Sequence, residues 1–148
     1  MKIYIGADHH GFRDKKLISD YLSSLGHEVI DEGDNKLDPK DDFPVYASLV
    51  AKHVLADNSE SSVGLLLCGS GQGMAMAANR FKGIRASLCW DINEAYTSRH
   101  DDNANILCLS ADKNDWPILK PILNTWLKTK FANEERYNRR IKELDKLG

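Results

Sequence analysis

A cysteine followed by a glycine-rich turn is the feature of this sequence with the clearest chemistry. Cys68 ends a short apolar run, and the residues after it include Gly69, Gly71 and Gly73. Glycines let the backbone approach a ligand closely, and the free amides of such a turn and of the helix start after it can hold negative charge. A cysteine beside such a positive end has a lowered pKa and can act as a thiolate base or nucleophile. The pattern indicates a reactive group next to an anion site.

A purely structural interpretation of these residues is also open. Buried cysteines are commonly small core residues, and Cys89 and Cys108 lie in apolar runs that favour this role for both. The segment GSGQG after Cys68 lacks the glycine spacing of the dinucleotide fingerprint, and no Gly-Lys-Ser or Gly-Lys-Thr follows it as in a Walker loop. The turn therefore favours a functional Cys68 without indicating a nucleotide.

Two further groups of residues have both a chemical and a structural interpretation. Asp8, His9 and His10 follow the first predicted strand, where an aspartate often caps the next helix. An Asp-His-His cluster can also bind metal, but adjacent residues point in different directions and no second cluster has ligand spacing, so we expect no metal site. Arg136 and Arg140 are four residues apart on a predicted helix and project side by side. They form either a solvated surface or a bidentate phosphate clamp.

The chain alternates predicted strands and helices, which is typical of a parallel sheet covered by helices on both faces. The strands are expected at 2–6, 28–30, 63–67 (leading to Cys68), 84–89 and 105–109. The expected helices end at Gly26, span 44–56, end at Arg80, span 91–100 and 115–128, and begin at Glu134. The polar segment 31–43 predicts a surface loop with a role at a site or an interface. Without repeats or linkers, residues 1–148 are expected to form a single domain.

Ligands of such sheets bind beyond the carboxyl ends of the strands. We therefore expect three loops, distant in sequence, to converge on one crevice there. They carry Asp8 and His9 after the first strand, Cys68 and Ser70 after the third, and His100, Asp101, Asp102 and Asn103 before the fifth.

Composition limits the class of protein. The 148 residues are enough for one domain, and a hydrophobic content of 42% with a charged content of 28% is that of a soluble globular protein. A net charge of −2 gives no electrostatic argument for a nucleic-acid partner. MKIYIGAD has neither the apolar region nor the cleavage site expected of a signal peptide, and no apolar stretch approaches the roughly 18 residues of a membrane span. Three cysteines without CxxC spacing argue against a disulfide framework and favour a cytoplasmic location.

Four segments together give the sequence a family resemblance. They are GADHHG at 6–11, FPVYA at 43–47, LLLCGSGQGMAMAANRFKGIRA at 65–86 and ERYNRRI at 135–141. In this order they resemble the ribose-5-phosphate isomerase B / galactose-6-phosphate isomerase family. The resemblance implies a Rossmann-like three-layer α/β/α sandwich with a five-stranded parallel sheet and no metal or other cofactor. It also implies a homodimer, or a dimer of dimers, whose sites use residues from both subunits.

The activity implied by the resemblance is aldose–ketose isomerisation of a sugar phosphate, with ribose 5-phosphate and ribulose 5-phosphate as the expected pair. A base removes a proton from the carbon next to the carbonyl and returns it to the neighbouring carbon through an enediolate. Cys68 matches the base of the cysteine-bearing members, whereas other members carry a glutamate at the position of Met74. Ser70 matches a hydroxyl that passes a proton between two substrate oxygens, and Asp8 matches a group that helps to open the sugar ring.

The remaining matched positions are implied to bind substrate. The turn amides would stabilise the enediolate oxygen, His9 and the two arginines would hold the phosphate, and one asparagine would be a supporting contact. These substrate-binding positions are His9, Gly69, Gly71, Gln72, Gly73, Asn79, Asn103, Arg136 and Arg140.

Some positions depart from the family pattern. The histidine expected four residues before the asparagine matching Asn105 is Asp101, with His100 one residue earlier, so either is a candidate for ring opening. An arginine that some members use for phosphate is Asp112, and the histidine after the first clamp arginine is Tyr137. Two alternatives therefore stay open: an isomerase of a six-carbon sugar phosphate of galactose 6-phosphate or allose 6-phosphate type, and a non-catalytic sugar-phosphate binding module.

Overall fold

A parallel sheet of five strands is the centre of the computed structural model, which describes residues 1–57, 59 and 61–148. Its strand order is β2-β1-β3-β5-β4, and every neighbouring pair is parallel. The strands are β1 (Lys2–Ala7), β2 (Glu28–Asp31), β3 (Ser62–Cys68), β4 (Ala86–Leu88) and β5 (Ile106–Ser110). The expected α/β sandwich with a five-stranded parallel sheet is confirmed.

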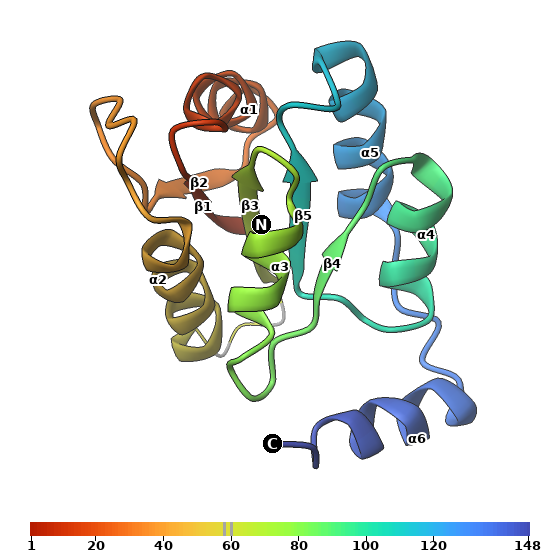
Figure 1. Cartoon of the computed structure of the whole chain (residues 1–148). Helices are drawn as coiled ribbons and strands as arrows, with labels where there is room; N and C mark the ends of the chain where they lie inside the picture. Colours follow the sequence, from red (N-terminus) through yellow and green to blue (C-terminus); the bar gives the residue numbers. More distant parts are fainter. Residues whose placement is uncertain (58, 60) are drawn as a thin grey trace.

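Helices cover both faces of the sheet (Figure 1). The helices of the described chain are α1 (Phe12–Ser24), α2 (Phe43–Ala56), α3 (Gln72–Ala78), α4 (Ile92–His100), α5 (Trp116–Lys128) and α6 (Glu135–Leu144), and of these α6 does not cover the sheet. Side chains of α1, α4 and α5 pack on one face, and those of α2 and α3 pack on the other. Because β3 lies in the middle and is covered twice, all seven of its residues are buried. This explains why its sequence reads as a continuous apolar run.

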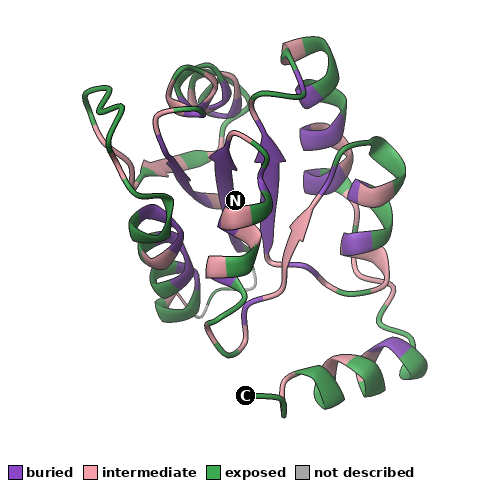
Figure 2. Ribbon diagram, viewed as in Figure 1, coloured by how far each residue is buried: buried purple, intermediate pink, exposed green. Residues whose placement is uncertain are grey.

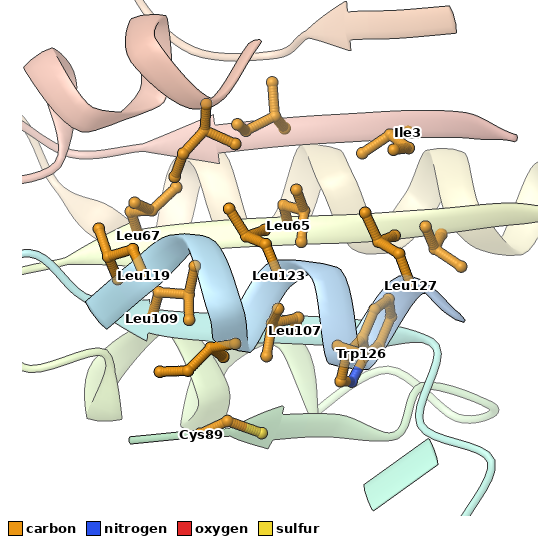
Figure 3. Close-up of a cluster of buried hydrophobic side chains, with 14 of the residues drawn as sticks. Ile3, Leu65, Leu67, Cys89, Leu107, Leu109, Leu119, Leu123, Trp126 and Leu127 are labelled. Atoms are coloured by element: carbon orange, nitrogen blue, oxygen red, sulfur yellow. The ribbon is translucent and has the colours of Figure 1, made fainter. Parts of the chain in front are cut away.

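The larger of the two core clusters lies on the face of the sheet that α1, α4 and α5 cover. Figure 3 shows Leu119, Leu123 and Trp126 of α5 facing Leu65 of β3 and Leu107 of β5. These side chains are completely buried, and burial of such residues contributes roughly 1.5–3 kcal/mol each to the free energy of unfolding. The core fixes the sheet, and with it the loops at the ends of the strands.

The edge strand β4 is shorter than the predicted strand 84–89. The amide of Arg85 donates to the side-chain oxygen of Asn105, at 2.8 Å, rather than to a backbone carbonyl. Asn105 also donates through Nδ2 to the carbonyl of Gly83, at 2.9 Å. Because this side chain takes up the Arg85 amide and the Gly83 carbonyl, the regular ladder begins only at Ala86.

The last helix, α6, lies beyond the lower end of the sheet and apart from the other helices (Figure 1). Its predicted apolar face consists of Tyr137, Ile141 and Leu144, of which only Tyr137 is buried and Leu144 is 49% exposed. Figure 2 accordingly shows most of this helix as exposed. Its packing face is incompletely covered within one chain.

Within the described part of the chain, none of the helices has the length and apolar character needed to cross a bilayer.

Candidate active site

Cys68 is the last residue of β3 and lies beside the end of β1. Leu67 pairs with Ala7, so the next residues, Cys68 and Asp8, end neighbouring strands at the same edge. The thiol is buried, with 5% of the residue exposed, and the amide of Gly71 donates a hydrogen bond of 3.1 Å to Sγ. The expected juxtaposition of Cys68 and Asp8 at the carboxyl edge is therefore present.

The other two cysteines are core residues. Cys108 and Cys89 are fully buried, and all three thiols are free. Burial raises the pKa of Cys108 well above its ordinary value, and burial also raises the pKa of Cys89. Both thiols therefore stay protonated. The Cys89 sulfur also lies 3.4 Å from the hydroxyl of Ser87 and 3.7 Å from that of Ser98.

The glycine turn needs its glycines for different reasons. Gly71 has φ of +76°, and a Cβ there would lie 2.5 Å from Cδ1 of Leu88. A Cβ at Gly73 would lie 2.8 Å from the ring of Phe43. The turn is also tied to the end of β5, because Ser110 Oγ donates to the carbonyl of Gly69 at 2.7 Å. It is thus a close-packed turn, held from two sides.

Polar groups of this turn are available to a ligand. Ser70 is exposed, and its Oγ accepts a hydrogen bond from the amide of Gln72 at 3.3 Å. Over residues 1–57, 59 and 61–148, the amides of Ser70 and Gly73 donate to no other group of the chain. Ser70 and Gln72 also line a cleft of about 270 Å³ with Trp90, Lys113 and Asn114. The arrangement offers N–H donors to an oxyanion beside the thiol.

Asp8 is a buried carboxylate, 7% exposed, that shapes the turn before α1. Its Oδ1 accepts hydrogen bonds from the amides of His10 at 3.0 Å and Gly11 at 3.4 Å. Gly11 is itself packed against β3, since a Cβ there would lie 2.6 Å from Cβ of Leu67. The helix-capping role considered from the sequence is wrong, because the N-cap of α1 is Gly11 and no side chain caps this helix. Asp8 instead closes the turn before α1, and this fixes its carboxyl group next to Cys68.

The two histidines after Asp8 have different partners. Nδ1 of His9 lies 2.6 Å from Oδ1 of Asp41, and this contact raises the pKa of His9. Nδ1 of His10 lies 3.1 Å from Oδ1 of Asp112, at the end of β5. A Cβ at Gly69 would lie 2.6 Å from Oδ2 of Asp112, so this carboxylate sits directly over the glycine turn.

One group of ligand types for a metal ion occurs in the described part of the chain. It consists of Asp8, His9 and Asp41, whose ligand atoms lie within 4.8 Å of one another. The hydrogen bonds above already use His9 Nδ1, Asp41 Oδ1 and Asp8 Oδ1. The chain's own donors thus account for the arrangement, and His10 of the sequence cluster has turned to Asp112.

A second group of predicted site residues surrounds the end of α4. Nδ1 of His100 lies 2.7 Å from Oδ1 of Asp101, and the rings of His100 and Tyr137 are 6.1 Å apart. The His100 contact, together with the Tyr137 hydroxyl and the charge of Arg136, lowers the pKa of Asp101. Arg136 is exposed, lies 4.6 Å from the Tyr137 ring and pairs with Glu134 at 3.1 Å.

Arg140 and Asn103 belong to the same end of the molecule. Burial raises the pKa of Asp102, and the charge of Arg140 acts against this shift. Asn103 has φ of +48°, and its carbonyl accepts a hydrogen bond of 3.1 Å from Nε of Arg85. Arg85 also pairs with Asp145 at 3.7 Å, which ties the 102–103 loop to the end of α6.

The predicted convergence of three loops on one crevice is wrong within one chain. Cys68 pairs with Ser110 at the carboxyl end of β5, whereas His100 to Asn105 precede Ile106 at its amino end. The two ends of β5 are four residue steps apart, which corresponds to about 13 Å. Figure 1 shows α6 beyond the amino end of this strand. The binding rule concerns segments that follow strands, and this run precedes one.

Asn79 lies away from the thiol as well. It follows α3, about 10 Å along that helix from the glycine turn. Its side chain accepts from the amide of Ala86 at 2.8 Å and donates to the carbonyl of Ala86 at 2.9 Å. Both polar atoms are used to join α3 to β4, so the expected substrate contact is replaced by a structural one within this chain.

Asp41 and Asn114 are residues at the carboxyl edge that sequence reasoning missed. Both lie in polar loops without periodicity, so no pattern distinguishes them from solvated neighbours. The one available signal was the length of the 31–43 loop, which predicted a role at a site without indicating a residue.

The fold and the carboxyl edge define a class: a doubly wound α/β protein with a thiol, a carboxylate and free turn amides at the ends of β1 and β3. Residues 3–144 match the family model described as Ribose/Galactose Isomerase. A probable ribose-5-phosphate isomerase B of Mycoplasma genitalium is 41% identical over 143 residues, covering 96% of this chain and 92% of that protein.

Solved structures give the same result. A ribose 5-phosphate isomerase from Thermotoga maritima has a TM-score of 0.92 and 38% identity, covering 99% of this chain and 98% of that one. The ribose-5-phosphate isomerase B of Mycoplasma genitalium with bound ribulose-5-phosphate has a TM-score of 0.91 and 38% identity, covering 97% and 93%. The chain belongs to the ribose/galactose isomerase family, and it is an isomerase.

Proposed function

We propose that residues 1–148 act as one sugar-phosphate isomerase domain that interconverts ribose 5-phosphate and ribulose 5-phosphate. The observation that carries the proposal is the buried thiol of Cys68, held by the Gly71 amide at 3.1 Å next to the end of β1. The relatives named ribose-5-phosphate isomerase B, one of them with bound ribulose-5-phosphate, support this choice of sugar.

Each group at the carboxyl edge has a role in the proposed reaction. Asp8 assists opening of the sugar ring, and the Cys68 thiolate then removes the proton from the carbon next to the carbonyl. Ser70, whose hydroxyl is exposed beside the turn, passes a proton between the two oxygens of the enediolate. The turn amides, including those of Ser70 and Gly73, stabilise the negative oxygen. Protonated Cys68 returns the proton to the neighbouring carbon, and no external cofactor enters this cycle.

The phosphate clamp is proposed to come from a second subunit. His9 lies at the carboxyl edge, whereas Arg136 and Arg140 lie on α6 beyond the opposite end of the sheet (Figure 1). In a homodimer with shared sites, α6 of one subunit reaches the Cys68 edge of the other. Two arginines one helical turn apart then hold the phosphate with His9.

Exposed apolar side chains support such an assembly. Met76 of α3 is 64% exposed, Trp90 is 50% exposed and Ile92 of α4 is 50% exposed. All three belong to elements at the β4 edge, and the apolar face of α6 is also incompletely covered. A second subunit packed along this edge would remove these side chains from water.

The same shared site would bring His100 and Asp101 to the sugar ring. Their close contact makes them act together: the side chain of Asp101 holds Nδ1 of His100, and the other ring nitrogen is left for the substrate. We therefore propose that His100, supported by Asp101, opens the sugar ring together with Asp8. A cytoplasmic location is part of the proposal, and the three free thiols support a reducing compartment.

The test compares substrates of the wild-type protein. Ribose 5-phosphate, galactose 6-phosphate and allose 6-phosphate are supplied in turn, and kcat/KM is measured for each. The proposal expects ribose 5-phosphate to have the highest value. A preference for either six-carbon sugar would overturn the choice of substrate. Calorimetric binding of ribose 5-phosphate without proton exchange at its second carbon would instead identify a binding module.

A further inference from the structure

The loop between β2 and α2 is held against the site at several points. Lys15, whose side chain is only 3% exposed, donates to Oδ1 of Asp31 at 2.8 Å and to the carbonyl of Asp34 at 3.0 Å. The hydroxyl of Tyr46 donates to Oδ2 of Asp34 at 2.5 Å. These contacts fix the first part of a segment that is otherwise mostly exposed. The last part of the loop is held at the carboxyl edge by the contacts of Asp41 with His9.

Asp41 is the residue that this loop presents to His9. Its side chain is 7% exposed, and its Oδ1 accepts from the backbone amide of His9 at 3.1 Å. The same oxygen lies 2.6 Å from Nδ1 of His9. A carboxylate only accepts hydrogen bonds, so Nδ1 must carry a proton. Asp41 thus fixes both the backbone and the ring of His9.

The state of the other ring nitrogen follows from this contact. In a neutral imidazole with a proton on Nδ1, Nε2 carries a lone pair, which repels the oxygens of a phosphoryl group. In the imidazolium both nitrogens are donors, and Nε2–H can bind phosphate. A carboxylate on Nδ1 stabilises the imidazolium form. The geometry therefore selects the form of His9 that suits an anion.

We propose that Asp41 is a positioning residue that holds His9 as an imidazolium with Nε2–H directed to the phosphoryl group of the substrate. This inference rests on the proposed function for the nature of the anion. The Asp41–His9 contact itself does not depend on it. Asp41 touches no substrate in this assignment and acts only through the ring and backbone of His9.

The charges around His9 favour the imidazolium. The hydrogen bond that His9 donates to Asp41 is the largest cause that raises the pKa of His9, and the charges of Asp8 and Asp38 add to it. Partial burial of the ring acts in the opposite direction. The ring of His10 lies 4.4 Å from that of His9, but His10 is itself paired with Asp112. Phosphate binding through His9 is thus present below its raised pKa and is lost as pH rises through it.

The experiment uses Asp41→Asn, with Asp42→Asn as a matched control. Asp42 is the exposed neighbour at the start of α2 and makes no side-chain capping hydrogen bond, so its variant removes the same charge without touching His9. KM and kcat for ribose 5-phosphate are measured from pH 6 to 9. In Asp41→Asn we expect KM to rise about tenfold at neutral pH, while kcat stays within about twofold of the wild-type value. We also expect the increase of KM with pH to begin about one pH unit lower than in the wild-type protein.

A second readout needs neither turnover nor the Asp41→Asn variant. The ring of His9 in the wild-type protein is titrated by NMR, with and without inorganic phosphate, using His9→Asn to assign its signal. The inference expects its pKa above the ordinary value of about 6.5 and a further rise when phosphate is added. A pKa at or below the ordinary value, or equal KM profiles for Asp41→Asn and Asp42→Asn, would overturn it. Absence of wild-type turnover with a raised, phosphate-sensitive His9 would count against the proposed function alone.

Discussion

The backbone amide of Gly71 donates a hydrogen bond of 3.1 Å to the sulfur of Cys68. Gly71 can do so because it adopts φ of +76°, a conformation that costs little only for glycine. The turn that forms the anion site and the residue proposed as the base are therefore one structural unit. A change in the conformation of the turn moves the thiol and the amides together.

Replacement of Gly71 by Ala should affect stability and activity together. The added Cβ meets Leu88 at 2.5 Å and the backbone of Leu109 at 3.0 Å, in addition to the strain of the positive φ. We expect the free energy of unfolding to fall by roughly 2–4 kcal/mol, measured by urea denaturation, with kcat reduced as well. Gly26→Ala is the matched control, since Gly26 has φ of +87° with nothing within 4 Å of the added Cβ. Equal effects of the two variants on kcat would contradict the role of the turn.

Removal of the Cys68 thiol should reduce kcat far more than it changes KM. A general base contributes about 10²–10⁴-fold to the rate, so Cys68→Ala is expected to lose activity in this range on ribose 5-phosphate. Cys108→Ala serves as the control, because this thiol is fully buried on the neighbouring strand and its raised pKa keeps it protonated. Similar losses of kcat in both variants would indicate a packing effect and remove Cys68 from the mechanism.

The negative charge of Asp112 in the wild-type protein is expected to weaken the binding of an anionic substrate. Its carboxylate lies over Gly69 beside His10, so it places a negative charge next to the proposed enediolate oxygen. Asp112→Asn keeps the size of the side chain and removes the charge. Because Asp112 is half exposed, we expect kcat/KM for ribose 5-phosphate to rise only about twofold to fivefold at low salt, and the gain to shrink at high salt. A lower kcat/KM would show instead that the carboxylate binds the substrate.

Most of the fold could be predicted because its signals are local. The buried strand β3 reads as a continuous apolar run, and Gly26 marks the end of the first helical segment. The limits of β4 could not be predicted in this way. They depend on the side chain of Asn105, which bonds Arg85 across 20 positions of sequence, and no pattern around residue 85 indicates that contact.

The site residues with a local sequence signal could likewise be predicted, and those that depend on distant contacts could not. Cys68 and its glycines could be found because the turn requires those residue types, and Asp8 because it follows a strand that ends beside β3. His100 and Asp101 were assigned to the wrong end of the sheet, since they precede β5 rather than follow it. Asp41 could not be found, because its partner His9 is 32 positions away and its loop has no periodicity.

The most direct test of the shared site is complementation between two inactive variants. Cys68→Ala lacks the base but keeps the α6 arginines, and Arg136→Ala keeps the base but lacks part of the clamp. Each is expected to be nearly inactive alone, with the doubly substituted chain as the control for residual activity. After unfolding and refolding as a mixture, half of the dimers carry one chain of each kind, and each mixed dimer has one intact site. We predict that the mixture recovers about a quarter of the wild-type kcat; a mixture no more active than the two variants measured separately would contradict a site built from two subunits.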